Sequence, residues 1–255
     1  MKSILKNHSI DGETGLMKQI LSVFLVLLLT CACLGAASAE AGKLYLHYIG
    51  GDADTEECDN NVPRNILRHH EDLQDRAEAF YARSKMKDYS NATAIKILKM
   101  SEENMSPDGI NVLIAYSHGG QSAFFADVEA DRITEIFLLD ACVSIGGKCA
   151  NNPSKGRVWA QWAVDMARKG VNVHLFASIG KHNEPSGQKV AIGNLEKAAE
   201  EDDFLVALGD GKYRVLDEAG NPAGEIETGL LEGNHKTICT DVEDRIVEYL
   251  YTLLE

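Results

Sequence analysis

Short apolar runs alternate along this chain with longer segments in which apolar residues recur at helical spacing. Four short β-rich runs predict strands: 43–49, 110–115, 133–139 and 171–177. The run 110–115 has no polar alternation, which is expected of a strand covered on both faces. Helical periodicity marks six further segments: 63–83, 92–103, 120–128, 158–168, 187–201 and a last one that begins at Asp241. This alternation predicts an α/β class, with a mainly parallel sheet and helices on both faces.

Residues 204–231 interrupt the alternation. Two β-rich runs, 213–216 and 225–231, flank the turn-rich segment 218–224, and this arrangement predicts a β-hairpin inserted before the last helix. Thr240 and Glu243 have the spacing of a capping box and predict the start of that helix. No linker divides the chain, so we expect a single α/β catalytic domain over residues 40–255.

The N-terminus has the three-part layout of a secretory signal. Residues 20–29 are apolar apart from Ser22, Lys18 precedes them, and Ala37-Ser38-Ala39 follows as a cleavage site. We therefore expect residues 1–39 to be a leader cleaved after Ala39, and the mature protein to be secreted or extracytoplasmic. Residues 1–16 are polar and of mixed charge, which makes Met17 the expected true start. An uncleaved anchor or a lipid anchor remains open at this stage.

The net charge of the chain limits the classes of binding partner that we expect. The whole chain carries a formal net charge of −14, and the leader holds three lysines against one Asp and one Glu. Without the leader the chain is therefore one unit more acidic. Such a surface repels phosphate backbones and anionic lipids. We expect no nucleic-acid partner and no stable membrane insertion after cleavage, and the oligomeric state stays open.

Export also changes how the cysteines are interpreted. Cys58, Cys142, Cys149 and Cys239 follow the leader, and an even number in an oxidising compartment indicates two disulfides. Cys142 and Cys149 are near enough in sequence to close a small loop, which leaves Cys58 for Cys239. Other pairings remain open.

Polar residues follow several of the predicted strands, where the carboxyl ends of a parallel sheet carry ligands and chemistry. The segment Ala115-Tyr116-Ser117-His118-Gly119-Gly120 stands between a strand and a helix. Asp140 ends the next strand, and His235 precedes the last helix. The string around Ser117 resembles the G-x-S-x-G nucleophile elbow of the α/β-hydrolases, with Ala115 in place of the first glycine, and the order Ser, Asp, His is the order of that superfamily.

The resemblance implies a three-layer α/β sandwich and acyl transfer on an ester or amide, as in serine esterases and lipases. Ser117 would be the nucleophile, His235 the base and Asp140 the group that orients the base. The backbone N–H groups of His118 and Gly51 would form the oxyanion hole. Glu184, after the following strand, is an alternative acid. The substrate would be a small molecule or an acyl compound, with no cofactor and no metal.

A second resemblance uses part of the same segment. Ser117-His118-Gly119 and Asp140-Ala141-Cys142 are similar to the His-Gly and Ala-Cys motifs of the caspase, gingipain and clostripain group of cysteine peptidases. That reading makes His118 and Cys142 a catalytic dyad, since a thiolate needs only a nearby base. It leaves His235 without a role and requires Cys142 to stay reduced. A third reading is a binding protein of α/β-hydrolase type that has lost activity.

Other candidate positions are read as structural. The acidic loop at 52–59 lacks the spacing of an EF-hand calcium site. We expect Trp159 and Trp162 to pack in the core and His174 to be a packed histidine inside its strand.

Overall fold

The computed structural model describes residues 42–51, 54–82, 91–126, 132–141, 153–179 and 187–255. Residues 42–255 form one compact unit, and the predicted leader lies outside the described residues. Within those ranges, no helix combines the length and the apolar character that crossing a membrane requires.

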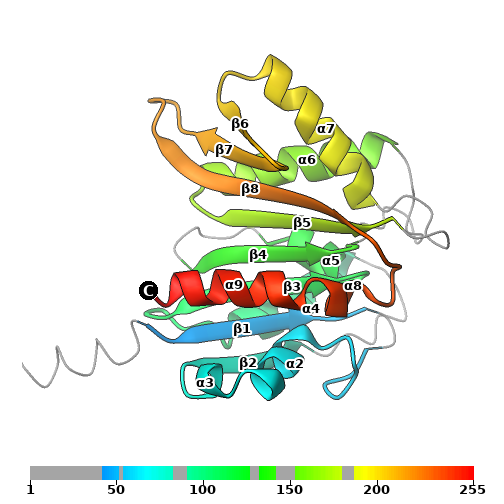
Figure 1. Ribbon diagram of the computed structural model, residues 1–255, viewed down its shortest axis with the longest axis vertical. Helices are drawn as coiled ribbons and strands as arrows, with labels where there is room; N and C mark the ends of the chain where they lie inside the picture. Colours follow the sequence, from blue (N-terminus) through cyan, green and yellow to red (C-terminus); the bar gives the residue numbers. More distant parts are fainter. Residues whose placement is uncertain (1–41, 52–53, 83–90, 127–131, 142–152, 180–186) are drawn as a thin grey trace, which may run out of the picture. The chain divides into compact units, whose positions relative to one another are not determined.

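The protein is a mixed α/β structure built on an eight-stranded, mainly parallel sheet (Figure 1). The strands are β1 Leu44–Ile49, β2 Ala77–Ala82, β3 Ile110–Tyr116, β4 Ile133–Leu139, β5 Asn172–Ser178, β6 Leu205–Gly209, β7 Lys212–Leu216 and β8 Pro222–Leu231. Their order is β2-β1-β3-β4-β5-β8-β7-β6. Neighbours from β2 to β8 pair in parallel, whereas β7 pairs antiparallel with both β8 and β6.

The helices connect these strands and close the chain. They are α2 Val62–His69, α3 Glu71–Gln74, α4 Asn91–Glu102, α5 Gly119–Phe124, α6 Pro153–Arg168, α7 Gly187–Glu201, α8 Ile238–Asp241 and α9 Glu243–Leu253. In Figure 1, α9 crosses in front of the sheet, while α4 and α5 lie behind it.

Side chains of a central strand enter two separate cores. In β3, Leu113 and Ala115 pack with residues of α4, α5, α6 and α7, whereas Val112 and Ile114 pack with residues of α2, α8 and α9. All four are fully buried. Burying a Leu, Ile or Val side chain stabilises a fold by about 1.5–3 kcal/mol. The apolar run therefore has no alternation because neither face of the strand meets water.

The predicted helix over 63–83 is wrong in its second half. Helix α2 ends at His69, because the next residue, His70, leaves the helical region with a φ of −123° and a ψ of 85°, and α3 adds one short turn. Ala77–Ala82 is then an edge strand that pairs only with β1. Its side chains are only partly covered, so its sequence lacks the continuous apolar run of the central strands. Ala77 and Phe80 fit helical spacing equally well, which is why the pattern misleads.

Two smaller expectations also fail. The capping box does not form: α8 already contains Thr240, and Val242 caps α9 without a side-chain hydrogen bond. The Glu243 carboxylate instead lies 2.8 Å from His69 Nδ1, so a contact between helices replaces the local one. Strand β6 was not predicted, since most of its residues are exposed and it pairs only with β7.

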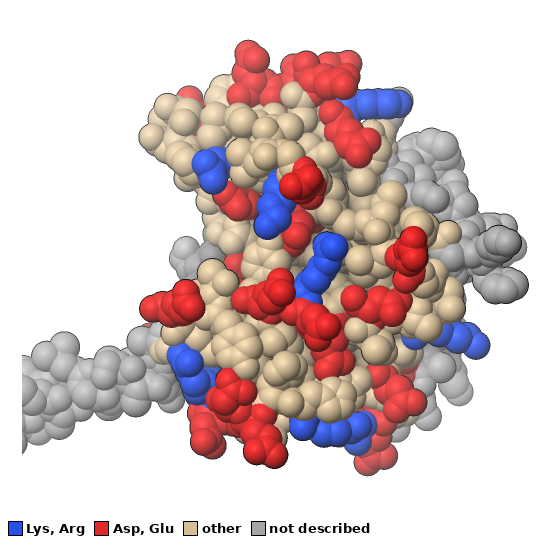
Figure 2. Space-filling view, in the orientation of Figure 1, with Lys and Arg blue, Asp and Glu red and all other residues tan. Residues whose placement is uncertain are grey.

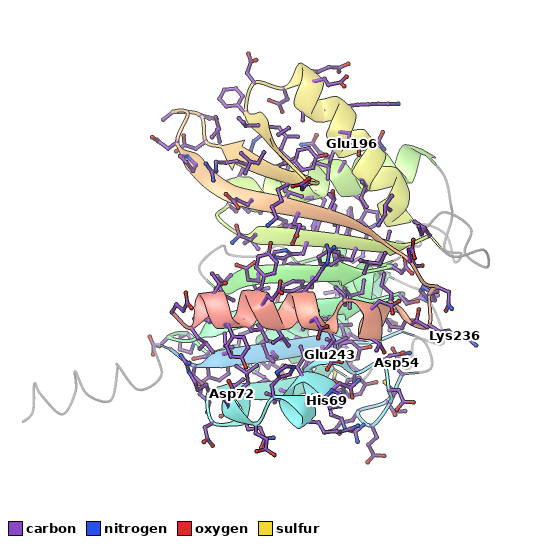
Figure 3. All side chains as sticks on the ribbon, in the orientation of Figure 1. Asp54, His69, Asp72, Glu196, Lys236 and Glu243 are labelled. Carbon is purple, nitrogen blue, oxygen red and sulfur yellow. The ribbon has the colours of Figure 1, made fainter. Side chains whose placement is uncertain are left out.

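The parallel strands present their carboxyl ends at one edge of the sheet. Figure 3 shows Asp54, from the loop after β1, and Lys236, from the loop after β8, at this edge. Figure 2 shows acidic side chains spread over the visible face with fewer basic ones between them, as the net charge of −14 requires.

Candidate active site

Ser117 stands at the turn from β3 into α5 and has a positive φ of 53°. A residue with a side chain rarely adopts this left-handed conformation, and such strain gathers at functional sites. The turn is held by two backbone bonds, from Ser117 N to Leu139 O and from Gly120 N to Ser117 O. The strained turn therefore places the Ser117 side chain at the carboxyl edge of the sheet.

Gly119 explains why this turn needs a glycine. A Cβ at Gly119 would lie 2.0 Å from the carbonyl oxygen of Ile49 and 2.9 Å from that of Gly50. The first turn of α5 is thus pressed against the end of β1, and only a residue without a side chain allows this approach. The close contact also brings Ser117 next to the Gly50-Gly51 turn.

Asp140 ends β4, the neighbour of β3, and also has a positive φ, of 42°. It is 2% exposed. Its Oδ1 accepts a hydrogen bond from Ser178 N at 2.9 Å, and its Oδ2 accepts one from Ser178 Oγ. These donors from the end of β5 fix the orientation of the carboxylate.

His235 lies between β8 and α8 and connects the other two residues. Its Nε2 is 2.9 Å from Ser117 Oγ, and its Nδ1 is 3.4 Å from Asp140 Oδ2. The second distance exceeds the usual hydrogen-bond length, and catalytic contacts in unliganded sites are often long. The structure thus brings together the three residues that the sequence singled out, in the order Ser117, His235, Asp140.

Tyr116 contacts His235 through both its ring and its hydroxyl group. Its ring stacks on the imidazole with centroids 5.0 Å apart, and its hydroxyl donates to the His235 carbonyl oxygen at 2.6 Å. Burial raises the pKa of Tyr116, with further contributions from nearby anionic groups that include Asp54 and Asp140. The Tyr116 hydroxyl thus links the loop that carries His235 to the end of β3.

The expected oxyanion donors have different surroundings. His118 directly follows Ser117 and precedes α5. Gly51 is adjacent to the serine, because a Cβ added to it would lie 3.2 Å from Ser117 Cβ. However, Gly51 N donates to Asp54 Oδ2 at 2.6 Å. The amide expected to bind an oxyanion is thus bonded to a carboxylate in this structure.

Several predicted residues lie outside the described ranges. They include Cys142 and Cys149 as well as the alternative acid Glu184. The dyad of His118 with Cys142 and the small disulfide loop are therefore not described. Cys58 and Cys239 are both free thiols, so the structure lends no support to the bond predicted between them. Burial raises the pKa of each thiol, which makes both weak nucleophiles at neutral pH.

The residues read as structural do lie in packed surroundings. Trp159 and Trp162 are in the core, where both rings contact Phe124. His174 is 3% exposed and lies between Glu135 and Glu227. In the part of the chain that the structure describes, no group of three or more His, Cys, Asp or Glu residues could hold a metal ion.

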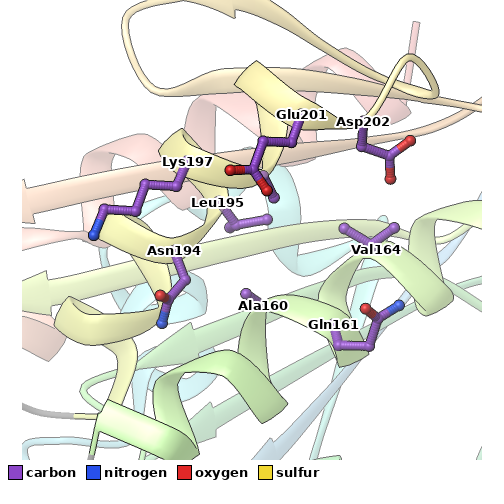
Figure 4. A pocket seen from close by; sticks show the side chains of 9 residues that line it. Ala160, Gln161, Val164, Asn194, Leu195, Lys197, Glu201 and Asp202 are labelled. Carbon is purple, nitrogen blue, oxygen red and sulfur yellow. The ribbon is translucent and has the colours of Figure 1, made fainter.

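A cavity of about 450 Å³ lies between α6 and α7 (Figure 4). Its lining mixes small apolar groups with polar and charged ones: Ala160, Gln161, Val164, Asn194, Leu195, Lys197, Ala198, Glu201 and Asp202. It contains none of the residues around Ser117, and we assign it no chemistry.

Sequence reasoning missed three residues of the site. Tyr116 immediately precedes the serine and Ser178 directly follows the predicted strand 171–177, so position alone could have nominated them. Asp54 belongs to the acidic loop at 52–59, which the charge pattern alone predicts to be exposed to solvent, yet it is 8% exposed. Its burial depends on the fold of the Gly50-Gly51 turn, which no local pattern reveals.

Comparisons with known proteins give no independent guide: the sequence matches no protein-family profile, and a search of curated proteins finds no match.

Proposed function

We propose that this protein is a serine hydrolase that acts by acyl transfer on an ester or amide substrate. The observation that carries the proposal is the contact of 2.9 Å between Ser117 Oγ and His235 Nε2, made by a serine in a strained turn. A neutral serine hydroxyl is a weak nucleophile, and an adjacent imidazole activates it by taking its proton.

The reaction follows from the three side chains. Ser117 Oγ forms a bond to the acyl carbon while its proton moves to His235 Nε2. The bond to the leaving group then breaks, and that proton passes from His235 to the departing oxygen or nitrogen. Water repeats the sequence on the acyl-enzyme and regenerates Ser117 with release of the acid. No redox partner is needed.

The proposed role of Asp140 is to orient His235 and to stabilise its protonated form. A carboxylate near Nδ1 keeps the Nδ1–H tautomer, leaves Nε2 free to accept a proton and stabilises the imidazolium that forms. The two bonds from Ser178 hold this carboxylate in place. The N–H groups of His118 and Gly51 are the proposed oxyanion donors, and each such donor is typically worth about 3–4 kcal/mol of barrier.

The proposal extends to the fold and the location. We infer a three-layer sandwich similar to that of α/β-hydrolases, in which residues 204–231 form an added β-hairpin. The two core clusters on the faces of β3 support this inference. We also propose that residues 1–39 are a leader removed on export, on the strength of their signal-like layout. Determining the N-terminus of the exported protein tests this, with Glu40 as the expected first residue.

Turnover of a short acyl ester, such as p-nitrophenyl acetate, tests the proposed chemistry. Wild type and Cys142→Ser should both hydrolyse the ester, whereas Ser117→Ala should show only the background rate. Activity that survives in Ser117→Ala but disappears in Cys142→Ser would instead assign the reaction to the cysteine.

A further inference from the structure

The Asp54 carboxylate is buried beside the proposed nucleophile, in a network of hydrogen bonds. Its Oδ2 accepts from Gly51 N at 2.6 Å and from the Tyr48 hydroxyl at 3.1 Å, and its Oδ1 accepts from Asn60 Nδ2 at 3.1 Å. The Asp54 main-chain carbonyl also accepts from the Tyr81 hydroxyl at 2.6 Å. The fold thus holds an anionic group firmly in the turn after β1.

This carboxylate lies on the side of Gly51 that faces the nucleophile. A Cβ added to Gly51 would be 3.4 Å from Asp54 Oδ2 and 3.2 Å from Ser117 Cβ. A Cβ added to Gly50 would be 2.7 Å from Asp54 Cβ, so the glycine at 50 leaves room for the Asp54 side chain. Because Gly50 and Gly51 lack side chains, the Asp54 carboxylate and Ser117 can both approach this turn closely from the same side of Gly51.

A carboxylate and an oxyanion compete for the same donor. The transition state of acyl transfer places negative charge on the former carbonyl oxygen, and an amide N–H stabilises it only if it points there. In this structure the Gly51 N–H points to Asp54 with a short, charge-assisted bond. A second anion at the same amide would be repelled by the first, since like charges at close range disfavour each other.

We propose that Asp54 is a resting-state lock on the Gly51 amide, which must release that amide before the amide can stabilise the oxyanion on the Ser117 adduct. This inference rests on the proposed hydrolase function. Asp54 is a positioning residue here, because it acts through Gly51 and does not touch the reacting atoms. The lock lowers the rate for any substrate that cannot displace the carboxylate, and weakening it should raise turnover.

Asp54→Asn tests the lock with little change of shape. The Asn oxygen can still accept from Gly51 and Tyr48, and the Asn60 amide can turn over to accept from the new NH₂ group. A neutral acceptor competes less well than a carboxylate for the amide. Asp59→Asn is the matched control, because it removes one exposed negative charge from the same loop, whereas the bond to Gly51 N comes from Asp54.

Two readouts separate a lock from a merely structural role. We expect Asp54→Asn to raise kcat on p-nitrophenyl acetate by about tenfold with little change in KM, since about 1.4 kcal/mol of barrier is tenfold in rate. We also expect it to tighten inhibition by phenylboronic acid, which forms an anionic tetrahedral adduct with serine, by a similar factor. Asp59→Asn should leave both values within about twofold of wild type.

An unchanged or lower kcat and an unchanged or weaker affinity for the boronic acid in Asp54→Asn would overturn the lock, and would mean that Asp54 holds the turn in its productive form. If Asp54→Asn does not fold, Asp54→Ser provides the second variant, because it removes the carboxylate that accepts from Gly51 N and keeps a small polar side chain. It should raise kcat in the same direction, and no rise there also overturns the lock. Failure of the hydrolase proposal is distinguishable, since wild type would then show no turnover that depends on Ser117.

Discussion

His235 Nε2 lies 2.9 Å from Ser117 Oγ, although the two residues are 118 positions apart in the sequence. The serine follows β3 and the histidine follows β8, two strands that are not neighbours in the sheet. Their meeting therefore depends on the whole arrangement of parallel strands and on the loop that Tyr116 holds. This contact is the observation on which the proposed roles of Ser117 as nucleophile and His235 as base depend.

Replacing Ser117 with glycine should separate activity from stability. The left-handed φ of 53° strains serine but not glycine, so Ser117→Gly should gain about 1 kcal/mol of unfolding free energy. In a chain of this size that raises Tm by about 2–4 °C. Ester hydrolysis should fall to background in the same variant. Thermal unfolding followed by circular dichroism, together with an esterase assay, measures both effects.

Asp210→Gly is the control for that variant. Asp210 has a φ of 50° in the turn between β6 and β7, whereas Ser117 follows β3. Aspartate tolerates the left-handed region better than serine does, so a smaller gain in Tm and unchanged hydrolysis are expected. Loss of stability in Ser117→Gly would show that the turn is not strained.

Asp140→Asn should lower kcat by about 10³-fold or more, because an amide cannot hold the imidazole in its productive tautomer. KM should change little, since the effect arises mainly in the transition state. Glu184→Gln should cost less than about tenfold. Steady-state kinetics of the two variants compares them directly, and a dead Glu184→Gln beside an active Asp140→Asn would transfer the role to Glu184.

Ser178→Ala tests the support of Asp140 separately. It removes the hydroxyl that donates to Asp140 Oδ2 but retains the backbone donor to Oδ1. We expect a loss of kcat of about tenfold, which corresponds to about 1.4 kcal/mol for one hydrogen bond to a charged group. A loss as large as that of Asp140→Asn would mean that Ser178 itself takes part in the reaction.

Gly119→Ala should damage both the fold and the activity. Its methyl group would meet the Ile49 carbonyl at 2.0 Å, so α5 must move away from β1. We expect a loss of about 1–3 kcal/mol of unfolding free energy, as for other overpacked sites, and a large loss of hydrolysis.

Gly193→Ala in α7 is the matched control, because nothing lies within 4 Å of its added Cβ, and it should stabilise the helix by up to about 1 kcal/mol. Chemical denaturation of the two variants provides the comparison.

The contribution of His174 to the free energy of unfolding should decrease as the pH rises. Burial alone would lower the pKa of His174, but its bonds to Glu135 and Glu227 outweigh that effect, so the pKa is raised above 6.5. The imidazolium therefore stabilises the fold fully below pH 6.5, and this contribution is lost as the pH rises through the higher folded value. His174→Gln should cost about 3 kcal/mol because it leaves the buried Glu135 charge without its partner. The difference in unfolding free energy between wild type and variant should shrink above pH 6.5, and a constant difference would contradict the charge assignment.

The contribution of His47 to stability should depend on pH in the opposite direction to that of His174. Burial lowers the pKa of His47 to about 4, so this ring is neutral in the folded protein. Unfolding exposes it to protonation below pH 6.5, and stability should therefore be lost as the pH falls from 6.5 towards 4. His47→Gln should remove that slope in urea unfolding at a series of pH values. A slope that is unchanged in the variant would assign it to other groups.

The sequence predicts the centre of this sheet better than its edges. Strand β4 has the predicted bounds, because it is buried over almost its whole length and four of its residues, 136–139, form a continuous apolar run. The sequence predicts a helix where the edge strand β2 lies, since Ala77 and Phe80 suit either period when one side of a strand is open to solvent. A pattern of apolar residues identifies strands that are buried, so it identifies a partly exposed edge strand less well.

The sequence likewise identifies some residues of the candidate site and not others. Ser117, Asp140 and His235 could be nominated because each follows a predicted strand or precedes a helix, in a known order. The bond from Gly51 to Asp54 could not be predicted, because it depends on the path of a turn and on the Tyr48 hydroxyl that helps to bury the carboxylate. Contacts that tertiary packing creates leave no periodic signal in the sequence.

Labelling with a fluorophosphonate, followed by mass spectrometry of the modified peptide, tests the central proposal most directly. The reagent phosphonylates a serine only when a base activates it, so the account predicts a single adduct on Ser117 in wild type, and none in His235→Ala. An adduct on any other residue, or full labelling of Ser117 without His235, would contradict the assignment of Ser117 and His235 as nucleophile and base.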